Sequence, residues 1–528
     1  MIEIEAKRRA AYLAMCRMLS VLCILTAAFY LKWLFFDALP DNRFLFWMLV
    51  GAEVFNIVQA AGFWYTISTQ RWTDPAPVDF SSTAETVDVF ITVYGEPVDI
   101  VERTLRGALA INHPRMAVWV LDDGPSPAIR DLVRAHGAGY LTRENRRGAK
   151  AGNINEALRR TSGDYVVVFD ADHVPVPEFL QRTMGAFHHA GVAFVQTPQS
   201  YSNRRNNRVA AGAHEQQGLF YGPIMRGRNS CGAVFACGTN IIYQRAALAA
   251  VGGLPEDSIT EDLRVSLELL KAGYTSEYVS TVLAHGMGPL DVSGYFSQQL
   301  RWARGGLDIL FKHKPFFRGM RMGTRIQYGL SFLYWFTGFA YLAYLFLPAA
   351  FLFTGQRPVL APNQYPVYFL PYIVTTLATM AYASDFKITF RTLWFTLGSF
   401  PAFIAALPSA LLGRDARFVV TSKHRTRRSL RPVSAQVVAV LVLTASVVYG
   451  VIVRGVSPAV MNNVAFALGH ILVVQGFIRY AWRAETTADD MGEDLLAEDR
   501  DEGGNAAPGS AGWEASPARS NDGEGTRR

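Results

Sequence analysis

Six long apolar segments constrain this chain more than any other feature. They cover residues 11–31, 44–67, 327–353, 366–384, 433–453 and 459–478. The first contains one charged residue, Arg17, the second contains one, Glu53, and the other four contain none. About 20 apolar residues span the hydrocarbon core of a bilayer. The sequence therefore predicts six crossing helices in a lipid bilayer, two before and four after a long polar stretch.

The basic residues Lys7, Arg8 and Arg9 precede the first apolar segment. Short cytoplasmic segments of membrane proteins carry an excess of Lys and Arg, which places the N-terminus in the cytosol. Two crossings then return the polar stretch at 70–325 to the same side. We expect a multi-pass protein of the plasma (inner) membrane whose polar domain is cytoplasmic.

A seventh uncharged segment, from Thr392 to Gly413, is long enough to cross but is predicted not to. The loop after it carries seven basic residues, which belong on the cytosolic side: Arg414, Arg417, Lys423, Arg425, Arg427, Arg428 and Arg431. Pro401 and Pro408 would also interrupt a straight helix. We therefore interpret 386–412 as interfacial or re-entrant helices.

The charge of the chain is distributed unevenly. Residues 484–528 carry twelve acidic and four basic side chains, net −8, so the total of +7 leaves +15 for residues 1–483. This excess is typical of proteins that meet nucleic acid, anionic lipid or a phosphorylated substrate, and composition does not choose among them. The acidic segment has few apolar residues and predicts a disordered tail.

The polar stretch alternates predicted strands with predicted helices. Apolar, β-rich runs at 87–94, 117–123, 164–172 and 192–198 are separated by helical patterns that include 97–111 and 149–160. This alternation indicates an α/β domain with a mixed, mostly parallel sheet. Ligands bind at the carboxyl ends of the strands in such sheets, so polar residues there are candidates for chemistry.

Acidic residues stand at two of these strand ends. Asp170 and Asp172 lie on one face of a strand, so both carboxylates can reach one Mg²⁺ or Mn²⁺ ion. The alternative is a solvated turn at the strand end, but the apolar run Tyr165–Phe169 before them favours a bound cation, because two acids buried side by side need a positive partner. Asp122 and Asp123 precede Gly124; they could accept hydrogen bonds from a nucleoside or form an ordinary Asp-Gly turn. Lys150 begins a predicted helix, where the N-terminus favours an anion such as a diphosphate.

Two further groups lie on predicted helices. Thr260 is a good N-cap for the helix that follows, and Asp262 is a candidate general base, although acids at a helix N-terminus are also favoured by the dipole alone. That position predicts a low pKa for the Asp262 carboxyl. Gln298, Arg301 and Trp302 share one helical face, which suits a sugar ring and a diphosphate, or alternatively an amphipathic interfacial helix.

In this order the motifs resemble those of the processive family 2 glycosyltransferases, the bacterial cellulose synthase catalytic subunits in particular. The motifs are Asp122-Asp123-Gly124, Asp170-x-Asp172, Thr260-Glu261-Asp262 and Gln298-x-x-Arg301-Trp302, together with Thr92-x-Tyr94-x-Glu96, Cys237-Gly238-Thr239 and Phe418-x-x-Thr421-x-Lys423. Gly95 stands where the family has Asn. Arg427 and Arg431 match part of a PilZ motif, but no DxSxxG follows, and no PilZ domain is expected.

The resemblance implies a GT-A-type catalytic domain inserted between membrane helices and a UDP-sugar donor. Its site residues would fall into four groups. Asp122, Asp123 and Asp172 would hold UDP; Asp170 and Asp172 would bind Mg²⁺ or Mn²⁺; Lys150 would contact the diphosphate; and Asp262, within Thr260-Glu261-Asp262, would be the base. Trp302 would stack on the acceptor, beside which Cys237-Gly238-Thr239 would lie, and Phe418, Thr421 and Lys423 would form a gating loop over the nucleotide.

The predicted organisation has seven parts. It comprises a membrane hairpin (1–69), a cytosolic GT-A domain (70–290), interfacial helices with the QxxRW motif (291–325), a membrane pair (326–384), interfacial helices with the gating loop (385–432), a second membrane pair (433–482) and the tail (483–528).

The resemblance implies polymerisation of UDP-glucose into a β-glucan of cellulose type and its export. The growing polysaccharide, the lipid bilayer and an accessory export subunit would be the partners, and nucleic acid would not. Aromatic residues at 327–353 would guide the polymer, although such residues are more often plain helix packing. A synthase of another polysaccharide, a non-processive lipid glycosyltransferase and a transporter with a nucleotide-sensing domain remain alternatives.

Overall fold

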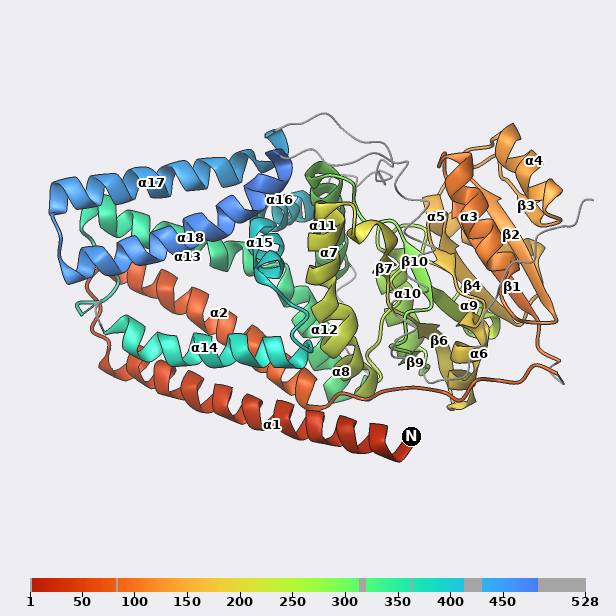
Figure 1. Ribbon diagram of the computed structural model, residues 1–528, viewed down its shortest axis with the longest axis horizontal. Helices are drawn as coiled ribbons and strands as arrows, with labels where there is room; N and C mark the ends of the chain where they lie inside the picture. Colours follow the sequence, from red (N-terminus) through yellow and green to blue (C-terminus); the bar gives the residue numbers. More distant parts are fainter. Residues whose placement is uncertain (1, 82–83, 313–319, 362–363, 413–429, 483–528) are drawn as a thin grey trace, which may run out of the picture. The chain divides into compact units, whose positions relative to one another are not determined.

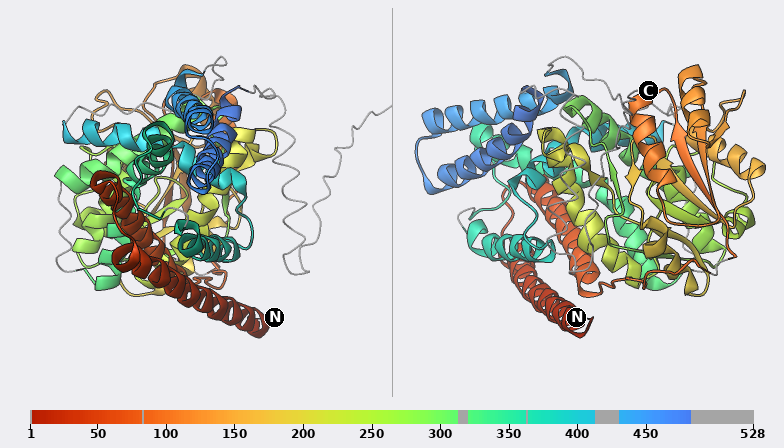
Figure 2. Two further views of the ribbon diagram at one scale, coloured as in Figure 1. Left: turned by 90° about the vertical axis from the view of Figure 1, so that its left-hand side faces the viewer. Right: turned by 45° about the vertical axis from the view of Figure 1, so that its right-hand side comes forward.

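The computed structural model describes residues 2–81, 84–312, 320–361, 364–412 and 430–482, all within one unit, Met1–Thr486. Among them, long helices gather on one side, and the strands with their covering helices gather on the other (Figure 1). The second view in Figure 2 shows the same separation of the red, teal and blue helices from the orange strands.

The chain begins with a helical hairpin. Helix α1 (Ile2–Lys32) continues into a π-helical turn (Trp33–Asp37), and α2 (Arg43–Ser68) runs back beside it. Asn42 caps α2, because its side chain accepts a hydrogen bond from the Leu45 amide at 3.1 Å. The hairpin predicted at 1–69 therefore begins and ends close to the observed helices.

A seven-stranded mixed sheet forms the core of the polar domain, in the order β3-β2-β1-β4-β8-β6-β9. Its strands are β1 (Val87–Val93), β2 (Met116–Asp122), β3 (Gly139–Leu141), β4 (Tyr165–Asp170), β6 (Val192–Gln196), β8 (Ile241–Gln244) and β9 (Thr275–Tyr278). Strands β3, β2, β1 and β4 are parallel, and only β8 runs against its neighbours. The four predicted strands correspond to β1, β2, β4 and β6.

Alternate residues of the strands bury two faces of the sheet. On β1, Val87, Val89 and Ile91 face one hydrophobic cluster, and Phe90 faces the other. Helices α3 (Val98–Leu109), α4 (Pro127–Ala135) and α6 (Phe179–Thr183), with the 3-10 helix Met184–His188, contribute to the first cluster. Helices α5 (Ala149–Arg160), α9 (Arg245–Ala250) and α10 (Glu261–Lys271) contribute to the second.

A small sheet and several helices connect this domain to the membrane helices. The sheet pairs β5 (Val174–Pro175), β10 (Ala284–Gly286) and β7 (Ser200–Tyr201). A 3-10 helix (Ser202–Arg204), α7 (Arg208–Leu219), a π-helix (Phe220–Ile224) and α8 (Met225–Ser230) follow β7, and α11 (Val292–Lys312) follows β10. In Figure 1, α7, α11 and α12 lie between the sheet and the long helices.

The remaining helices complete the apolar part of the chain. They are α12 (Met322–Tyr334), α13 (Thr337–Thr354), α14 (Tyr365–Ala383), α15 (Phe390–Gly398), α16 (Phe400–Leu411), a 3-10 helix (Arg431–Val433), α17 (Ser434–Arg454) and α18 (Pro458–Trp482). The prediction of one crossing helix at 327–353 is therefore wrong. It is divided between α12 and α13 at Trp335–Phe336.

Six helical segments in the described residues are long and apolar enough to cross a membrane. They are Glu5–Asp37, Arg43–Ser68, Thr337–Thr354, Phe390–Leu411, Arg431–Arg454 and Pro458–Trp482. The number agrees with the prediction, but Phe390–Leu411 replaces the predicted 366–384. The segment Phe390–Leu411 is broken at Ser399, where α15 ends and α16 begins with Pro401 in its first turn. Whether Phe390–Leu411 or 366–384 crosses the membrane stays a prediction.

Candidate active site

The carboxyl ends of three parallel strands meet at one polar cavity. The register places Thr92 of β1 beside Asp170 of β4, and Val93 beside Asp122 of β2, so the strand ends are level. The cavity has a volume of about 320 Å³. Most of the predicted site residues line it: Thr92, Tyr94, Glu96, Asp123, Lys150, Asp170, Asp172, Cys237, Gly238, Thr260, Glu261, Asp262, Gln298, Arg301 and Trp302.

Asp170 and Asp172 form an acidic cluster at the end of β4, and His173 belongs to it. One ligand atom from each of the three side chains lies within 4.8 Å of the others. His173 Nδ1 lies 3.2 Å from Asp172 Oδ1, and its Nε2 is buried with no hydrogen-bond partner among the described residues. Carboxylate oxygens with one imidazole suit a divalent cation such as Mg²⁺ or Mn²⁺. The residues present therefore fit a metal site.

Lys150 lies in the first turn of α5 and reaches across to this cluster. Its ammonium group forms an ion pair with Asp170 and donates a hydrogen bond to the Gly238 carbonyl at 2.7 Å. Burial raises the pKa of the Asp170 carboxyl, but the Lys150 ammonium opposes that effect and the pKa ends below its ordinary value. Burial lowers the pKa of Lys150, yet the carboxylates of Asp170 and Glu261 outweigh it and raise the pKa overall.

The two acids after β2 have different surroundings. Asp123 lines the cavity, and Arg143 binds both its oxygens at 2.6 and 2.7 Å. Asp122 is fully buried outside the lining and accepts hydrogen bonds from the Gly124 amide at 2.9 Å and the Tyr140 hydroxyl at 2.9 Å. Its oxygens hold the turn that presents Asp123, and the predicted contact of Asp122 with UDP stays a prediction.

The loop before β8 brings a tight turn to the cavity. Gly238 has φ +81°, and a Cβ at this position would lie 3.2 Å from Asp262 Oδ2 and 3.8 Å from Lys150 Nζ. Glycine therefore lets the backbone pass close to both charged groups. Thr239 is fully buried outside the lining, and its hydroxyl accepts a hydrogen bond from the Asp170 amide at 3.0 Å, so it supports Asp170. Its predicted place beside the acceptor stays a prediction.

Glu261 and Asp262 form the first turn of α10. Burial, followed by the charge of Asp262, raises the pKa of Glu261 to about 7. Burial also raises the pKa of Asp262, whose Oδ1 accepts a hydrogen bond from the Leu263 amide at 2.8 Å. The predicted low pKa is wrong, because desolvation outweighs the helix N-terminus. Thr260 occupies the N-cap position, but its side chain makes no capping hydrogen bond, contrary to the expectation.

Helix α11 brings Gln298, Arg301 and Trp302 to the cavity from the membrane side. Because all three line the same cavity, they share one face of the helix, as predicted. The gating-loop residues Phe418, Thr421 and Lys423 lie outside the described residues. Arg143 and His173 were not predicted; His173 directly follows the second acid of the DxD motif, which was the available signal.

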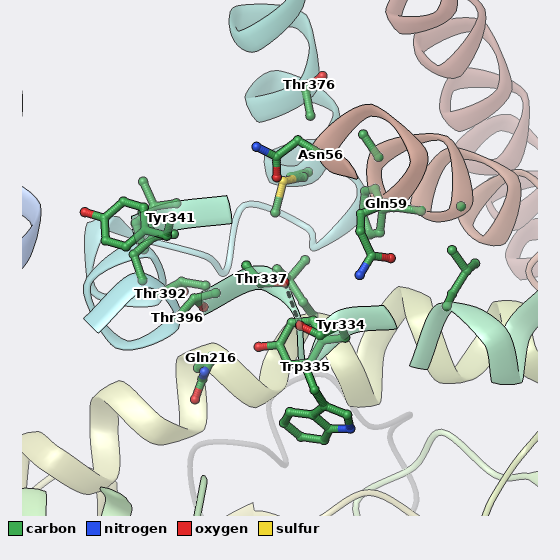
Figure 3. A pocket seen from close by; sticks show the side chains of 18 of the residues that line it. Asn56, Gln59, Gln216, Tyr334, Trp335, Thr337, Tyr341, Thr376, Thr392 and Thr396 are labelled. Atoms are coloured by element: carbon green, nitrogen blue, oxygen red, sulfur yellow. Dashed lines mark hydrogen bonds between the residues drawn. The ribbon is translucent and has the colours of Figure 1, made fainter. Parts of the chain in front are cut away.

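A second, larger cavity of about 790 Å³ adjoins the first and extends between the long helices. Gln199, Cys237, Thr260, Asp262 and Trp302 line both cavities. At its other end the lining includes the loop residues Arg357–Val359. Figure 3 shows Asn56 and Gln59 of α2, Thr376 of α14, Tyr341 of α13 and Gln216 of α7 around this space.

The lining of the second cavity combines aromatic rings with uncharged polar groups. Of the aromatic residues expected at 327–353, five line it: Phe332, Tyr334, Trp335, Tyr341 and Tyr344. The Tyr341 hydroxyl and the hydroxyls of Thr376 and Thr392 are buried there with no hydrogen-bond partner among the described residues. Buried polar groups of this kind are normally satisfied by water or by a ligand.

Comparisons with known proteins agree with this architecture. Residues 84–305 match the family "Glycosyltransferase like family 2", and residues 249–428 match the family "Cellulose synthase". The chain is 32% identical over 379 residues to the cellulose synthase catalytic subunit of Komagataeibacter sucrofermentans, a match that covers 69% of this chain and 50% of that relative. The corresponding subunit of Pseudomonas fluorescens is 34% identical over 382 residues, covering 68% of this chain and 51% of it.

The chain spans about half the length of the curated relatives that it matches. A mannosyltransferase of Pyrobaculum calidifontis, solved with GDP-mannose and Mn²⁺, superposes with a TM-score of 0.51 at 20% identity and covers 70% of this chain and 100% of that one. This likeness identifies the fold as GT-A-like. Sequence and fold together place the chain in glycosyltransferase family 2, among its cellulose synthase-like members.

Proposed function

We propose that this protein is a processive, inverting glycosyltransferase of the plasma membrane that polymerises UDP-glucose into a β-glucan and exports it. The catalytic domain would face the cytoplasm. The observation that carries the proposal is the junction of the two cavities at Asp262 and Trp302. A polymer that grows at Asp262 would enter the space between the membrane helices directly.

The small cavity supports the binding of a nucleotide sugar. Asp123, held by Arg143, would accept hydrogen bonds from the nucleoside, and Lys150 and Arg301 would meet the diphosphate. Asp170 and Asp172, with His173, would hold Mg²⁺ or Mn²⁺. When bound, that cation neutralises charge on the leaving diphosphate.

The position and the raised pKa of Asp262 support its role as the general base for the acceptor hydroxyl. It lines both cavities, so it lies between the donor and a chain in the larger space. Its raised pKa makes it a stronger base than an exposed aspartate. Trp302 offers a flat ring on which the terminal sugar can stack, and the unpaired hydroxyls farther along the cavity can bond the sugars that follow.

The experiment is synthesis by the purified protein in proteoliposomes supplied with UDP-glucose and Mg²⁺ or Mn²⁺. We expect a long product that linkage-specific glucanases degrade, and we expect its synthesis to stop when EDTA removes the cation. Release of single-sugar products only would favour a non-processive lipid glycosyltransferase. Resistance of a long product to β-1,4-glucanase, with cleavage by another glycanase, would assign a different polysaccharide.

A further inference from the structure

Glu53 places a carboxyl group in the middle of α2, within a segment predicted to cross the membrane. Its side chain is completely buried. An ionisable group in this position is costly, and membrane proteins retain one where it serves a pathway or a binding site. Glu53 does not line the large cavity. It does contact a residue that lines this cavity, and through that contact it can influence the shape of the cavity.

The carboxyl group bonds one tyrosine of the wall. The Tyr365 hydroxyl on α14 donates a hydrogen bond to Glu53 Oε1 at 2.6 Å. Glu53 Oε2 has no hydrogen-bond partner in the described ranges, and the same is true of the hydroxyl of Tyr30, whose ring packs edge-on against Tyr365 at 5.9 Å. The bond to Tyr365 joins Glu53 on α2 directly to helix α14.

A second tyrosine is held from the next turn of the same helix. Asn56, three residues after Glu53, donates a hydrogen bond to the Tyr344 hydroxyl of α13 at 2.6 Å. Tyr344, Tyr365 and Asn56 all line the cavity. Helix α2 thus anchors the hydroxyl groups of two tyrosines on two other helices. Anchoring at the hydroxyl fixes where the outer end of each ring lies in the cavity wall, and the position of a ring decides whether a sugar can stack on it.

We propose that Glu53 is a positioning residue of the tunnel, which fixes Tyr365 as a stacking surface for the passing carbohydrate chain. This inference rests on the proposed function. The hydrogen bond stabilises one position of the ring, and its loss leaves a buried hydroxyl unsatisfied. The Tyr365 ring, which also packs against Phe369 and Phe466, then shifts to give its hydroxyl another partner, and the chain is held less firmly between additions.

The test compares Glu53→Gln, Glu53→Leu and Tyr365→Phe in proteoliposomes supplied with UDP-glucose and Mg²⁺. The amide oxygen of Glu53→Gln can still accept the Tyr365 hydroxyl, so the product should keep its length. Glu53→Leu and Tyr365→Phe should each shorten the product several-fold while the KM for UDP-glucose stays within about twofold of wild type. Tyr365→Phe removes a single oxygen, so it remains informative where Glu53→Leu fails to fold.

Thr379→Val is the matched control. Thr379 is a buried residue of the same helix α14, bonds Cys23 at 3.1 Å and does not line the cavity. Full-length product from Glu53→Leu and Tyr365→Phe would overturn the inference, as would equal shortening by Thr379→Val. A wild-type protein that makes no polymer would instead overturn the proposed function, so the two failures are distinguishable.

Discussion

Asp262 lines both cavities, so its side chain lies where they meet. Lys150 and Asp262 both lie close to Gly238. Under the proposed function, this cation would stabilise the departing phosphate and this carboxylate would remove a proton.

Replacement of Asp262 should remove the base and leave the donor site in place. We expect Asp262→Asn to lower kcat by about 10²–10⁴-fold, the range typical of general bases. UDP binding, measured by calorimetry, should be little changed. The control is Glu268→Gln on the same helix, because Glu268 is a partly exposed acid that pairs with Lys271. Full activity of Asp262→Asn would assign the base elsewhere.

The raised pKa of Asp262 predicts the pH dependence of the rate. A base acts only when it is deprotonated, and its raised pKa moves the loss of activity to higher pH than an ordinary aspartate would give. We expect kcat to fall as the pH decreases, with a midpoint above the usual value of about 4. The same limb should persist in Glu261→Gln. Its disappearance there would identify Glu261, whose pKa is raised to about 7, as the titrating group.

At the scale of elements, one close helix contact places Asp262, the proposed base, near Trp302, the proposed acceptor platform. Gly305 of α11 faces Thr260 at the start of α10, and a Cβ on Gly305 would lie 2.3 Å from Thr260 Cγ2. Trp302 lies one turn before Gly305 on α11, and Asp262 lies two residues after Thr260. The glycine therefore lets the helix that carries Trp302 rest directly on the turn that carries Asp262.

Gly305→Ala should separate these two elements. Overpacking of a tight contact costs about 1–3 kcal/mol, and we expect kcat to fall at least tenfold while the protein still purifies as a monodisperse species. Gly329→Ala is the matched control, because Gly329 lies within helix α12 with nothing near the added methyl group. Equal kcat for the two variants would show that the contact does not align the site.

Much of the α/β domain could be predicted from the sequence, and the features that the prediction missed have physical causes. Apolar runs such as Tyr165–Phe169 predict buried strands, because burial and strand propensity act locally. Strand β8 was missed: its four residues pair with β4 and β6, which precede it by tens of residues, and periodicity does not report such pairing. The bond from Arg143 to Asp123 spans twenty residues and depends on the fold in the same way.

At the scale of the whole molecule, the two cavities share lining residues and would form one route under the proposed function. The small cavity is polar and lies at the sheet edge, whereas the large one is lined mainly by aromatic and aliphatic side chains of the membrane helices. The sequence motifs predicted the small cavity, because the residue types within each motif already indicate a chemical role. The second arises from helices that are far apart in the sequence, so its lining could not be read from any one segment.

A bulky residue inside the tunnel should shorten the product without weakening the donor site. Thr376 of α14 lines the large cavity, and its buried hydroxyl has no hydrogen-bond partner in the part of the chain that the structure describes. We expect Thr376→Trp to fill part of this space, so that elongation stops after a few sugars while the KM for UDP-glucose is unchanged. Val374→Trp is the control, because Val374 lies on the same helix with 59% of its surface exposed and does not line the cavity. Product sizing on a gel makes the comparison. Full-length product from Thr376→Trp would mean that the chain leaves by another path, since an indole in a space of about 790 Å³ must meet whatever passes through it.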